Sequence, residues 1–227
     1  MAATARRLTQ ATRAVAWVLA RAAVPAATFA SLATAIASRH GVPFELDIAL
    51  HAWSVDHRSL STVSIARLIT ASAGGVRPYV AVLFSGWAAC GPATALKRKV
   101  LTAAVAVLAL ASGGWVRGVV TAALARPRPP LVDWAATASG YAFPSGHSTT
   151  SALAAGFLFW ATRRAHSPRV ARVVGTCGMG WATAVGASRV YLGMHWSTDV
   201  LGGWLFAAVW LTLALPPIAA LTTDASP

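Results

Sequence analysis

The sequence has few charged residues, and acidic residues are the scarcest of them. Charged residues make up 11% of the chain, hydrophobic residues make up 56%, and the mean hydropathy is +0.60. A typical soluble domain has about 25% charged residues, so this chain has too little charge to cover a water-facing surface. The composition therefore predicts an integral membrane protein, with residues 1–227 forming a single domain rather than one or two soluble ones.

The few acidic residues are also scattered, which argues against a site built from clustered carboxylates. A two-metal hydrolase needs several carboxylates close together, so we expect no metal site of that kind. Both cysteines, Cys90 and Cys177, lie in apolar runs and are expected to pack there. The six acidic residues are Glu45, Asp47, Asp56, Asp133, Asp199 and Asp224.

Basic residues are more numerous: 19 Lys and Arg give a formal net charge of +13. Such a balance is also typical of nucleic-acid-binding proteins. Here the basic residues do not form one stripe, because most lie at the ends of apolar runs. This distribution favours the flanks of membrane spans, so the expected partner is the bilayer and not a nucleic acid.

Six uncharged runs are the main basis for predicting the architecture. A span needs about 20 mostly apolar residues, and flanking arginines can extend a shorter run. In the fourth run Gly140 and Pro144 place the helix start near His147. The sequence predicts an all-α, polytopic membrane protein with a bundle of six transmembrane helices, over about 14–38, 77–96, 100–125, 147–163, 172–188 and 196–217.

The segment between the first two spans has a different pattern. Residues 43–60 mix charges with apolar residues at helical spacing, which predicts an interfacial helix. Residues 61–75 predict a further short helix that leads into the second span, with a seventh span as the alternative. For the first run, a cleaved signal peptide is the alternative, but its apolar stretch is long for one.

The loops differ in charge, which predicts the orientation in the membrane. Cytoplasmic loops carry an excess of Lys and Arg. With six spans, one side holds five acidic residues together with basic ones that include Arg39, Arg58, Arg126, Arg128 and Arg189, whereas the other has ten basic residues and no acid before the final tail. We therefore expect the second side, and both termini, to be cytoplasmic. Its basic residues are Arg6, Arg7, Arg13, Lys97, Arg98, Lys99, Arg163, Arg164, Arg169 and Arg172.

Three polar clusters fall on the opposite, outer side, at residues 125–134, 141–150 and 188–200. In the second cluster Ser145 is the expected N-cap of a helix. The free N–H groups at a helix N-terminus bind phosphate well, and Gly146 would let a ligand approach the backbone. A helix start without any function explains the same residues when they are taken alone.

The third cluster contains a histidine and an aspartate at helical spacing. His195 and Asp199 are four residues apart, so on a helix they share one face. The Asp can then accept from one imidazole nitrogen and leave the other as a nucleophile or base. For the pair alone, a plain helix start is an equally good interpretation. Arg189 adds a planar charged fork suited to phosphate, so the outer side predicts a phosphoryl-transfer site.

These motifs resemble a known signature. Arg128-Pro129, the PSGH sequence of residues 144–147 and the SR-x5-H-x3-D sequence of residues 188–199 resemble the three-part signature of the type-2 phosphatidic acid phosphatase superfamily of membrane lipid phosphatases. The motifs cover residues 121–199, and the six-helix pattern extends the resemblance to most of the chain.

The resemblance implies a role for each site residue. His195 attacks phosphorus and forms a phosphohistidine, and Asp199 orients His195. His147 protonates the leaving oxygen and then activates water. The phosphoryl oxygens are held by Arg128, Ser145, Gly146 and Arg189, and no cofactor is required.

The first motif departs from the family pattern of Lys, six residues and Arg-Pro. Thr121 occupies the position where the lysine is expected. Arg117 lies one helical turn deeper on the same face, and Arg126 is the other candidate. Our hypothesis is that Arg117 or Arg126 supplies the missing charge to the phosphate site.

The expected substrate is an amphiphilic lipid phosphate that keeps its tail in the bilayer. Undecaprenyl diphosphate, phosphatidic acid and phosphatidylglycerol phosphate all fit, and the composition is compatible with a bacterial plasma membrane. A vanadate-dependent haloperoxidase resembles the same motifs, but those enzymes are soluble. A non-catalytic lipid-phosphate binding or transport protein is the alternative that Thr121 supports best. The sequence leaves the oligomeric state open. The aromatic residues expected beside the site are Trp134, Tyr141, Phe143 and Trp196.

Overall fold

The computed structural model describes the backbone of residues 2–222 and the side chains of residues 16–222. This part of the chain is all-α, as predicted, and contains no strand. It consists of α1 (Ala2–Ser38), α2 (Glu45–Asp56), α3 (Leu60–Ser72), α4 (Arg77–Ala88), α5 (Leu96–Leu124), the 3-10 helix η1 (Leu131–Asp133), α6 (Gly146–Ala165), α7 (Pro168–Tyr191) and α8 (Ser197–Ala220).

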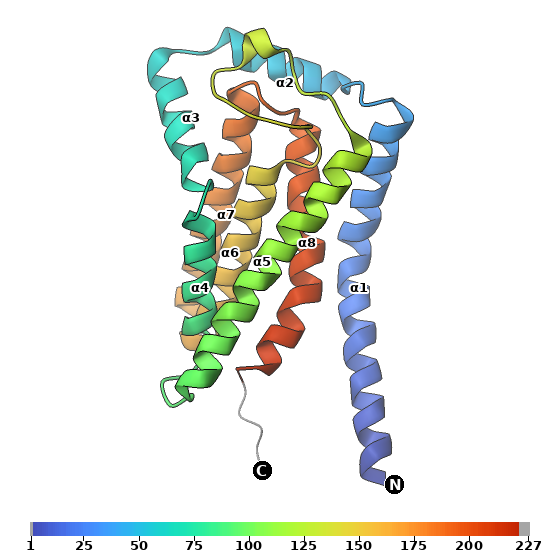
Figure 1. The fold of residues 1–227 in the computed structure, drawn as a ribbon, viewed down its shortest axis with the longest axis vertical. Helices are drawn as coiled ribbons and strands as arrows, with labels where there is room; N and C mark the ends of the chain where they lie inside the picture. Colours follow the sequence, from blue (N-terminus) through green and yellow to red (C-terminus); the bar gives the residue numbers. More distant parts are fainter. Residues whose placement is uncertain (1, 223–227) are drawn as a thin grey trace.

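The long helices form a bundle with α6 at its centre. Helix α6 packs against α4, α5, α7 and α8, whereas α1 lies at one edge and packs mainly against α8. Helix α2 runs across one end of the bundle, and the connection between α5 and α6 loops over the same end (Figure 1). The first residue of α6 therefore lies beneath this covered end.

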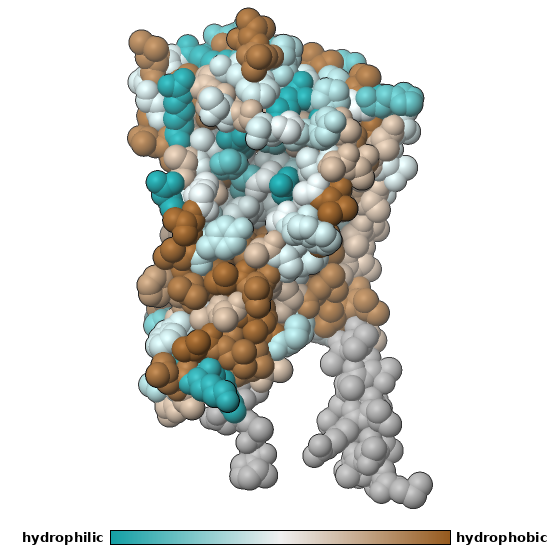
Figure 2. Space-filling view, viewed as in Figure 1, coloured by the Kyte–Doolittle hydropathy of each residue, from teal (hydrophilic) through white to brown (hydrophobic). Residues whose placement is uncertain are grey.

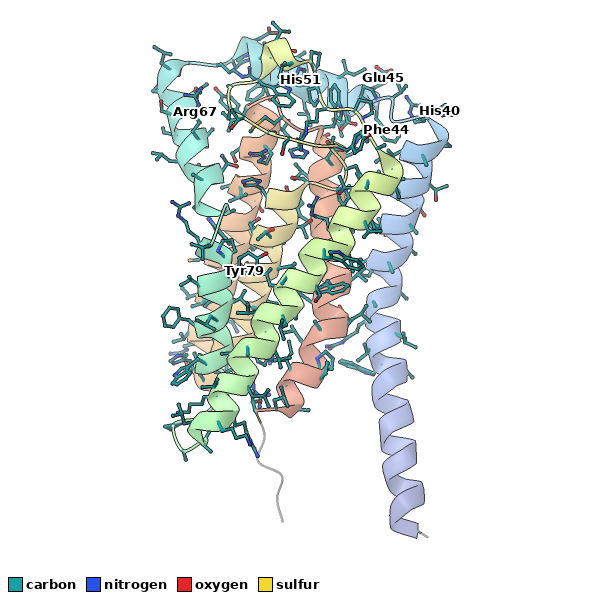
Figure 3. All side chains as sticks on the ribbon, in the orientation of Figure 1. His40, Phe44, Glu45, His51, Arg67 and Tyr79 are labelled. Carbon is teal, nitrogen blue, oxygen red and sulfur yellow. The ribbon has the colours of Figure 1, made fainter. Side chains whose placement is uncertain are left out.

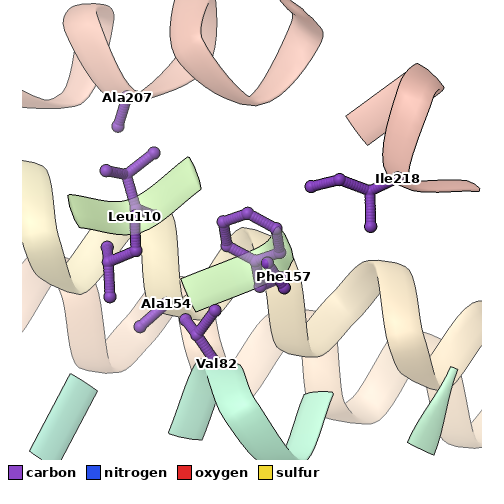
Figure 4. Close-up of a cluster of buried hydrophobic side chains, with 8 residues drawn as sticks. Val82, Leu110, Ala154, Phe157, Ala207 and Ile218 are labelled. Atoms are coloured by element: carbon purple, nitrogen blue, oxygen red, sulfur yellow. The ribbon is translucent and has the colours of Figure 1, made fainter. Parts of the chain in front are cut away.

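The hydrophobic core joins α4, α5, α6 and α8 (Figure 4). Phe157 of α6 is fully buried in it, beside Val82 of α4, Leu110 of α5 and Ile218 of α8. Between helices in a bilayer such contacts stabilise the bundle through van der Waals packing, because lipid tails are as apolar as the side chains. This core fixes the helix that carries His147 relative to the helix that carries Asp199.

Three helices are long and apolar enough to cross a membrane, at Ala16–Ser38, Leu96–Leu124 and Ser197–Ala220. A fourth span results if α3 and α4, which meet at a bend of 46°, are counted as one. The protein is thus an integral membrane protein, and the count of six spans stays a prediction for α6 and α7. Helix α6 packs against other helices on several sides and buries hydroxyl groups there. Because of these hydroxyl-bearing residues, its composition is less apolar than that of a lipid-facing helix.

Helix α4 is shorter than the span predicted for this segment. Helix α4 ends at Ala88, and residues 89–95 form a turn that contains Gly91 and Pro92, where the span was predicted to reach residue 96. Twelve residues of helix measure about 18 Å, which is short of the roughly 30 Å hydrocarbon core of a bilayer. Counted together, α3 and α4 are long and apolar enough for one bent span, and α3 is the short helix predicted to lead into it.

The surface of the bundle shows which regions suit lipid. Hydrophobic side chains cover much of α4 and α5, whereas hydrophilic side chains gather towards the end crossed by α2 (Figure 2). Phe84, Leu108 and Trp115 are exposed large apolar side chains of this kind. The basic residues Arg6, Arg7 and Arg13 lie outside the part of the chain whose side chains are described.

Candidate active site

The structure brings the three predicted clusters together at the end of the bundle beneath α2. Arg128 of the first cluster contacts His195 of the third, with 2.9 Å between Nη1 and Nε2. Ser145 of the second cluster donates its backbone N–H to the carbonyl of Asp199 at 3.0 Å. Residues about 70 positions apart in sequence thus form one polar site within a largely apolar bundle.

His195 lies in the short connection between α7 and α8 and is buried. Its Nδ1 lies 3.4 Å from Oδ2 of Asp199, while its Nε2 faces Arg128. Since a guanidinium can only donate hydrogen bonds, Nε2 must accept, and in the neutral ring the proton sits on Nδ1. This tautomer directs the N–H towards Asp199 and leaves Nε2 as the unprotonated ring nitrogen.

The surroundings of His195 keep the ring neutral. Burial lowers the pKa of His195 to about 4, against an opposing effect of Asp199, and the charges of Arg128 and Arg189 lower the pKa further. A neutral imidazole has the free lone pair that a nucleophile requires. The ring is therefore neutral at pH 7, with its Nε2 engaged by Arg128.

Asp199 is held from two sides at the start of α8. Its Oδ2 accepts from the backbone N–H of Trp196 at 2.8 Å, and its Oδ1 accepts from Nη1 of Arg126 at 2.6 Å. The carboxylate is completely buried, and it lies in the first turn of α8, where the helix dipole favours a negative charge. These contacts fix the orientation of the oxygen that faces His195.

The start of α6 is built by the PSGH sequence. Ser145 is the N-cap, as predicted, and its buried hydroxyl accepts from the N–H of Ser148. A Cβ on Gly203 would lie 2.8 Å from the carbonyl oxygen of Ser145, so α8 approaches α6 this closely only with glycine there. His147 is half-buried, and His195 and the nearby arginines are close enough to interact with it electrostatically.

Arg189, which is predicted to bind phosphate, is buried, with 4% of its surface exposed. Its Nη1 donates to Oγ1 of Thr70 on α3 at 3.1 Å. Its Nε is buried and has no partner among the described residues. A buried donor without a partner is costly, so this nitrogen suits an anion that enters the site.

Arg128 holds two loops together as well as contacting His195. Its guanidinium donates to the carbonyl oxygens of Ser139, Gly140, Tyr141 and Met194, at 2.8–3.1 Å. This network fixes the connection before α6 against the connection before α8. The predicted role of Arg128 in binding phosphate would be added to this structural one.

Arg117 lies against the start of α6, one helical turn from Thr121. Its Nη1 donates to Oγ1 of Thr121 at 3.0 Å and to the carbonyl of Pro144 at 3.2 Å. A Cβ on Gly146 would lie 3.4 Å from the central carbon of this guanidinium. The cation of Arg117 therefore lies over the start of α6, and this geometry supports the hypothesis that Arg117 replaces the lysine.

Arg126 lies in a different place from the one predicted. Helix α5 is followed by Ala125 in a left-handed conformation (φ 44°), and Arg126 enters the interior behind Asp199. The side chain is completely buried and forms ion pairs with Asp47 at 2.8 Å and Asp199 at 2.6 Å. Because its charge is engaged by two carboxylates, Arg126 is not available as the replacement for the lysine.

Sequence reasoning missed the part of the site that comes from α2. Asp47 is completely buried and contacts Arg126, and His51 contacts Asp133 of η1 with 3.0 Å between Nε2 and Oδ2. His51, Phe44 and Glu45 lie together at the end crossed by α2 (Figure 3). The only signal was the scarcity of acids, because a carboxylate within such an apolar chain needs a partner.

Comparison with known proteins agrees with this geometry. The model of the PAP2 superfamily matches residues 102–220, which is more than half of the chain. The matched range contains all three motifs and runs from α5 to α8. The chain belongs to the PAP2 superfamily, which confirms the resemblance found in the motifs.

Curated relatives share part of the sequence. The chain is 39% identical over 95 residues to phosphatidylglycerophosphatase B of Escherichia coli strain K12, and equally to that of Shigella flexneri. The alignment covers 38% of this chain and 34% of each relative. The chain therefore matches about a third of the length of these relatives.

A solved structure shares the fold over most of the chain. It is the crystal structure of the first transmembrane PAP2 type phosphatidylglycerolphosphate phosphatase from Bacillus subtilis, with a TM-score of 0.72. The match covers 86% of this chain and 94% of that chain, at 23% sequence identity. The arrangement of helices is thus that of a transmembrane PAP2 protein.

Proposed function

We propose that this protein is a lipid phosphatase that hydrolyses a phosphate ester through a phosphohistidine on His195. The observation that supports it best is the position of Nε2 of His195, which accepts from Arg128 and belongs to a ring held neutral by burial. A neutral nucleophile beside several fixed cations is what attack on a phosphate requires.

The reaction would proceed in two steps. In the first, Nε2 of His195 attacks phosphorus, the bond to the leaving oxygen breaks, and His147 gives that oxygen a proton. In the second, His147 takes a proton from water, which attacks the phosphohistidine and releases inorganic phosphate. Asp199 stabilises the positive charge that the ring of His195 gains in the phosphoenzyme.

The phosphoryl oxygens need donors throughout both steps. We assign this role to the guanidinium groups of Arg117, Arg128 and Arg189, together with the N–H groups at the start of α6 that include Gly146. Fixed cations and helix N-termini stabilise the charge of a transferring phosphoryl group. The buried hydroxyl of Ser145 holds the first turn of α6 in place for this purpose.

For the substrate we propose a lipid phosphate monoester of the phosphatidylglycerol phosphate type. The relatives named above are phosphatidylglycerophosphatases. The site also lies at the end of the bundle towards which hydrophilic side chains gather, next to the apolar surface (Figure 2). Phosphatidic acid and undecaprenyl diphosphate present the same headgroup chemistry and are the alternatives to test.

For the location we propose a bacterial plasma membrane with the site on the extracytoplasmic face. Helix α1 begins, and α8 ends, at the end of the bundle away from α2 (Figure 1). Lys97 and Lys99 open α5 at that same distant end, and the positive-inside rule places such residues in the cytoplasm.

Phosphate release from a panel of lipid phosphates by the purified protein in detergent tests this function. We expect release from phosphatidylglycerol phosphate, insensitive to a chelator and absent in His195→Asn. Binding of these lipids without any phosphate release would instead establish the non-catalytic alternative. Activity that a chelator removes would contradict the mechanism proposed here.

A further inference from the structure

Four buried side chains contact one another in series, from α2 to His195. Asp47 contacts Arg126, Arg126 contacts Asp199, and Asp199 contacts His195, with atom separations of 2.8, 2.6 and 3.4 Å. Asp47, Arg126 and Asp199 are completely buried, and His195 is 2% exposed. This series of contacts connects α2, which carries none of the three motifs, to the atoms that would carry out the proposed reaction.

Asp47 is bound to the start of α8 as firmly as to Arg126. Its Oδ1 accepts from Oγ of Ser197 at 2.6 Å and from the backbone N–H of Thr198 at 2.9 Å, and its Oδ2 accepts from Oγ1 of Thr198 at 2.8 Å. Asp199 is the next residue of α8. Helix α2 thus holds the first turn of α8 through one carboxylate.

The hydrogen bonds also keep Asp47 charged. Burial alone would raise the pKa of Asp47, but the hydrogen bonds from Ser197, Thr198 and Arg126 outweigh burial and lower it. The buried group therefore contains one cation between two carboxylates. One negative charge is left over beside His195, where the positive charge of a phosphohistidine would form.

Arg126 also decides which oxygen of Asp199 meets the histidine. Its Nη1 engages Oδ1 at 2.6 Å, which leaves Oδ2 for Nδ1 of His195. Its other terminal nitrogen, Nη2, is held by Asp47 at 2.8 Å. Without Asp47, Nη2 of Arg126 would lose its carboxylate partner, whereas Nη1 would keep Thr198 as well as Asp199. The guanidinium would then shift towards Asp199 and compete with His195 for that carboxylate.

We propose that Asp47 of α2 is a positioning residue that acts through Arg126 on Asp199 and His195. The inference rests on the proposed phosphatase function and extends its catalytic unit to a helix outside the motif region. Asp47 touches neither the substrate nor the reacting atoms in this scheme. Its effect should therefore appear in the rate of phosphoryl transfer and not in phosphate binding.

The test compares Asp47→Asn with Glu45→Gln in the purified full-length protein. Both variants replace a first-turn carboxylate of α2 by its amide, but Glu45 is exposed. Outer partners of a catalytic group typically cost about 10–100-fold in activity when removed. We expect a loss of this size in kcat for Asp47→Asn, with the inhibition constant of inorganic phosphate within about twofold of wild type, and no change for Glu45→Gln.

A second variant separates positioning from folding. Arg126→Lys keeps the charge but lacks the fork needed to hold both carboxylates, so it should also lower kcat with phosphate inhibition retained. The double variant Asp47→Asn/Arg126→Lys should then lose much less than the product of the single losses, because both act on one unit.

Three results would overturn the inference. One is wild-type kcat in Asp47→Asn. Another is an equal loss of kcat and of phosphate inhibition together with a lower melting temperature, which would show a structural role only. The third is multiplicative losses in the double variant. Absence of phosphate release from every lipid by the wild-type protein would instead refute the proposed function itself, and the inference with it.

Discussion

Nη1 of Arg128 lies 2.9 Å from Nε2 of His195, so the nitrogen that would attack phosphorus is held by a cation. The same guanidinium is a candidate donor to the phosphoryl oxygens. When a phosphate enters, the donor can transfer its hydrogen bond from the imidazole to the anion. That exchange would expose the lone pair of Nε2 only when a substrate is present.

Substitution of each histidine should block a different step. We expect His195→Asn to abolish both phosphate release and the phosphoenzyme, with a loss on the order of 1,000-fold or more, as for other members of catalytic triads. His147→Ala should stop turnover but retain phosphate binding, since Arg128 and Arg189 remain. Labelling with a substrate carrying radioactive phosphate, followed by gel analysis, measures the phosphoenzyme. Full turnover in either variant would contradict these assignments.

Arg117 should prove to be the functional replacement for the lysine of the first motif. Removal of a charged donor to the transition state typically costs about 100–1,000-fold, so Arg117→Ala should reduce kcat/KM by about that amount. The double variant Arg117→Ala/Thr121→Lys should regain much of the loss, because a lysine at position 121 reaches the start of α6 from the next turn.

Arg163→Ala is the matched control for Arg117→Ala. Arg163 is an exposed arginine in the last turn of α6, at the other end of the helix from His147. It should retain wild-type activity. If Arg117→Ala is as active as this control, the charge at the start of α6 is not required and the compensation hypothesis fails.

The parts of the site that lie within the three motifs were predictable from sequence. The i, i+4 spacing of His195 and Asp199 and the N-cap role of Ser145 are local, and the structure contains both. Topology alone also predicted that the clusters meet at one end of the bundle. The superfamily match confirms the family that these motifs indicated.

The contribution of α2 was not predictable in the same way. Asp47 reaches Arg126 across 79 residues of sequence, and no periodicity indicates such a contact. The same reason applies to Arg126. Only Pro127 separates it from Arg128, yet Arg126 contacts Asp47 and Asp199 whereas Arg128 contacts His195. The limit of α4 was missed since the apolar run continues beyond Ala88, through a turn that contains Gly91 and Pro92.

The pH dependence should reflect a histidine that resists protonation. Only neutral His195 attacks, and burial lowers its pKa to about 4. The rate of phosphoenzyme formation should therefore stay constant as the pH falls from about 7 to about 5, and then decline through the pKa of His195. Quench-flow measurements with an aryl phosphate give this rate. The leaving group of an aryl phosphate needs no proton, so only the effect of the ester's own protonation on the rate has to be corrected for. A decline centred near 6.5, the ordinary pKa of histidine, would contradict the assignment.

Gly74, between α3 and α4, should determine which leaving groups fit. A Cβ at this position would lie 3.4 Å from Nε2 of His147, the atom that would protonate the leaving oxygen. We expect Gly74→Leu to reduce kcat/KM for lipid phosphates on the order of 100-fold, because a displaced leaving group loses its alignment with the acid, and to affect a small aryl phosphate much less. Gly180→Leu on α7, where a Cβ meets nothing within 4 Å, should change neither rate. Equal losses for both substrates in Gly74→Leu would show that the residue affects His147 itself and not the space for the lipid.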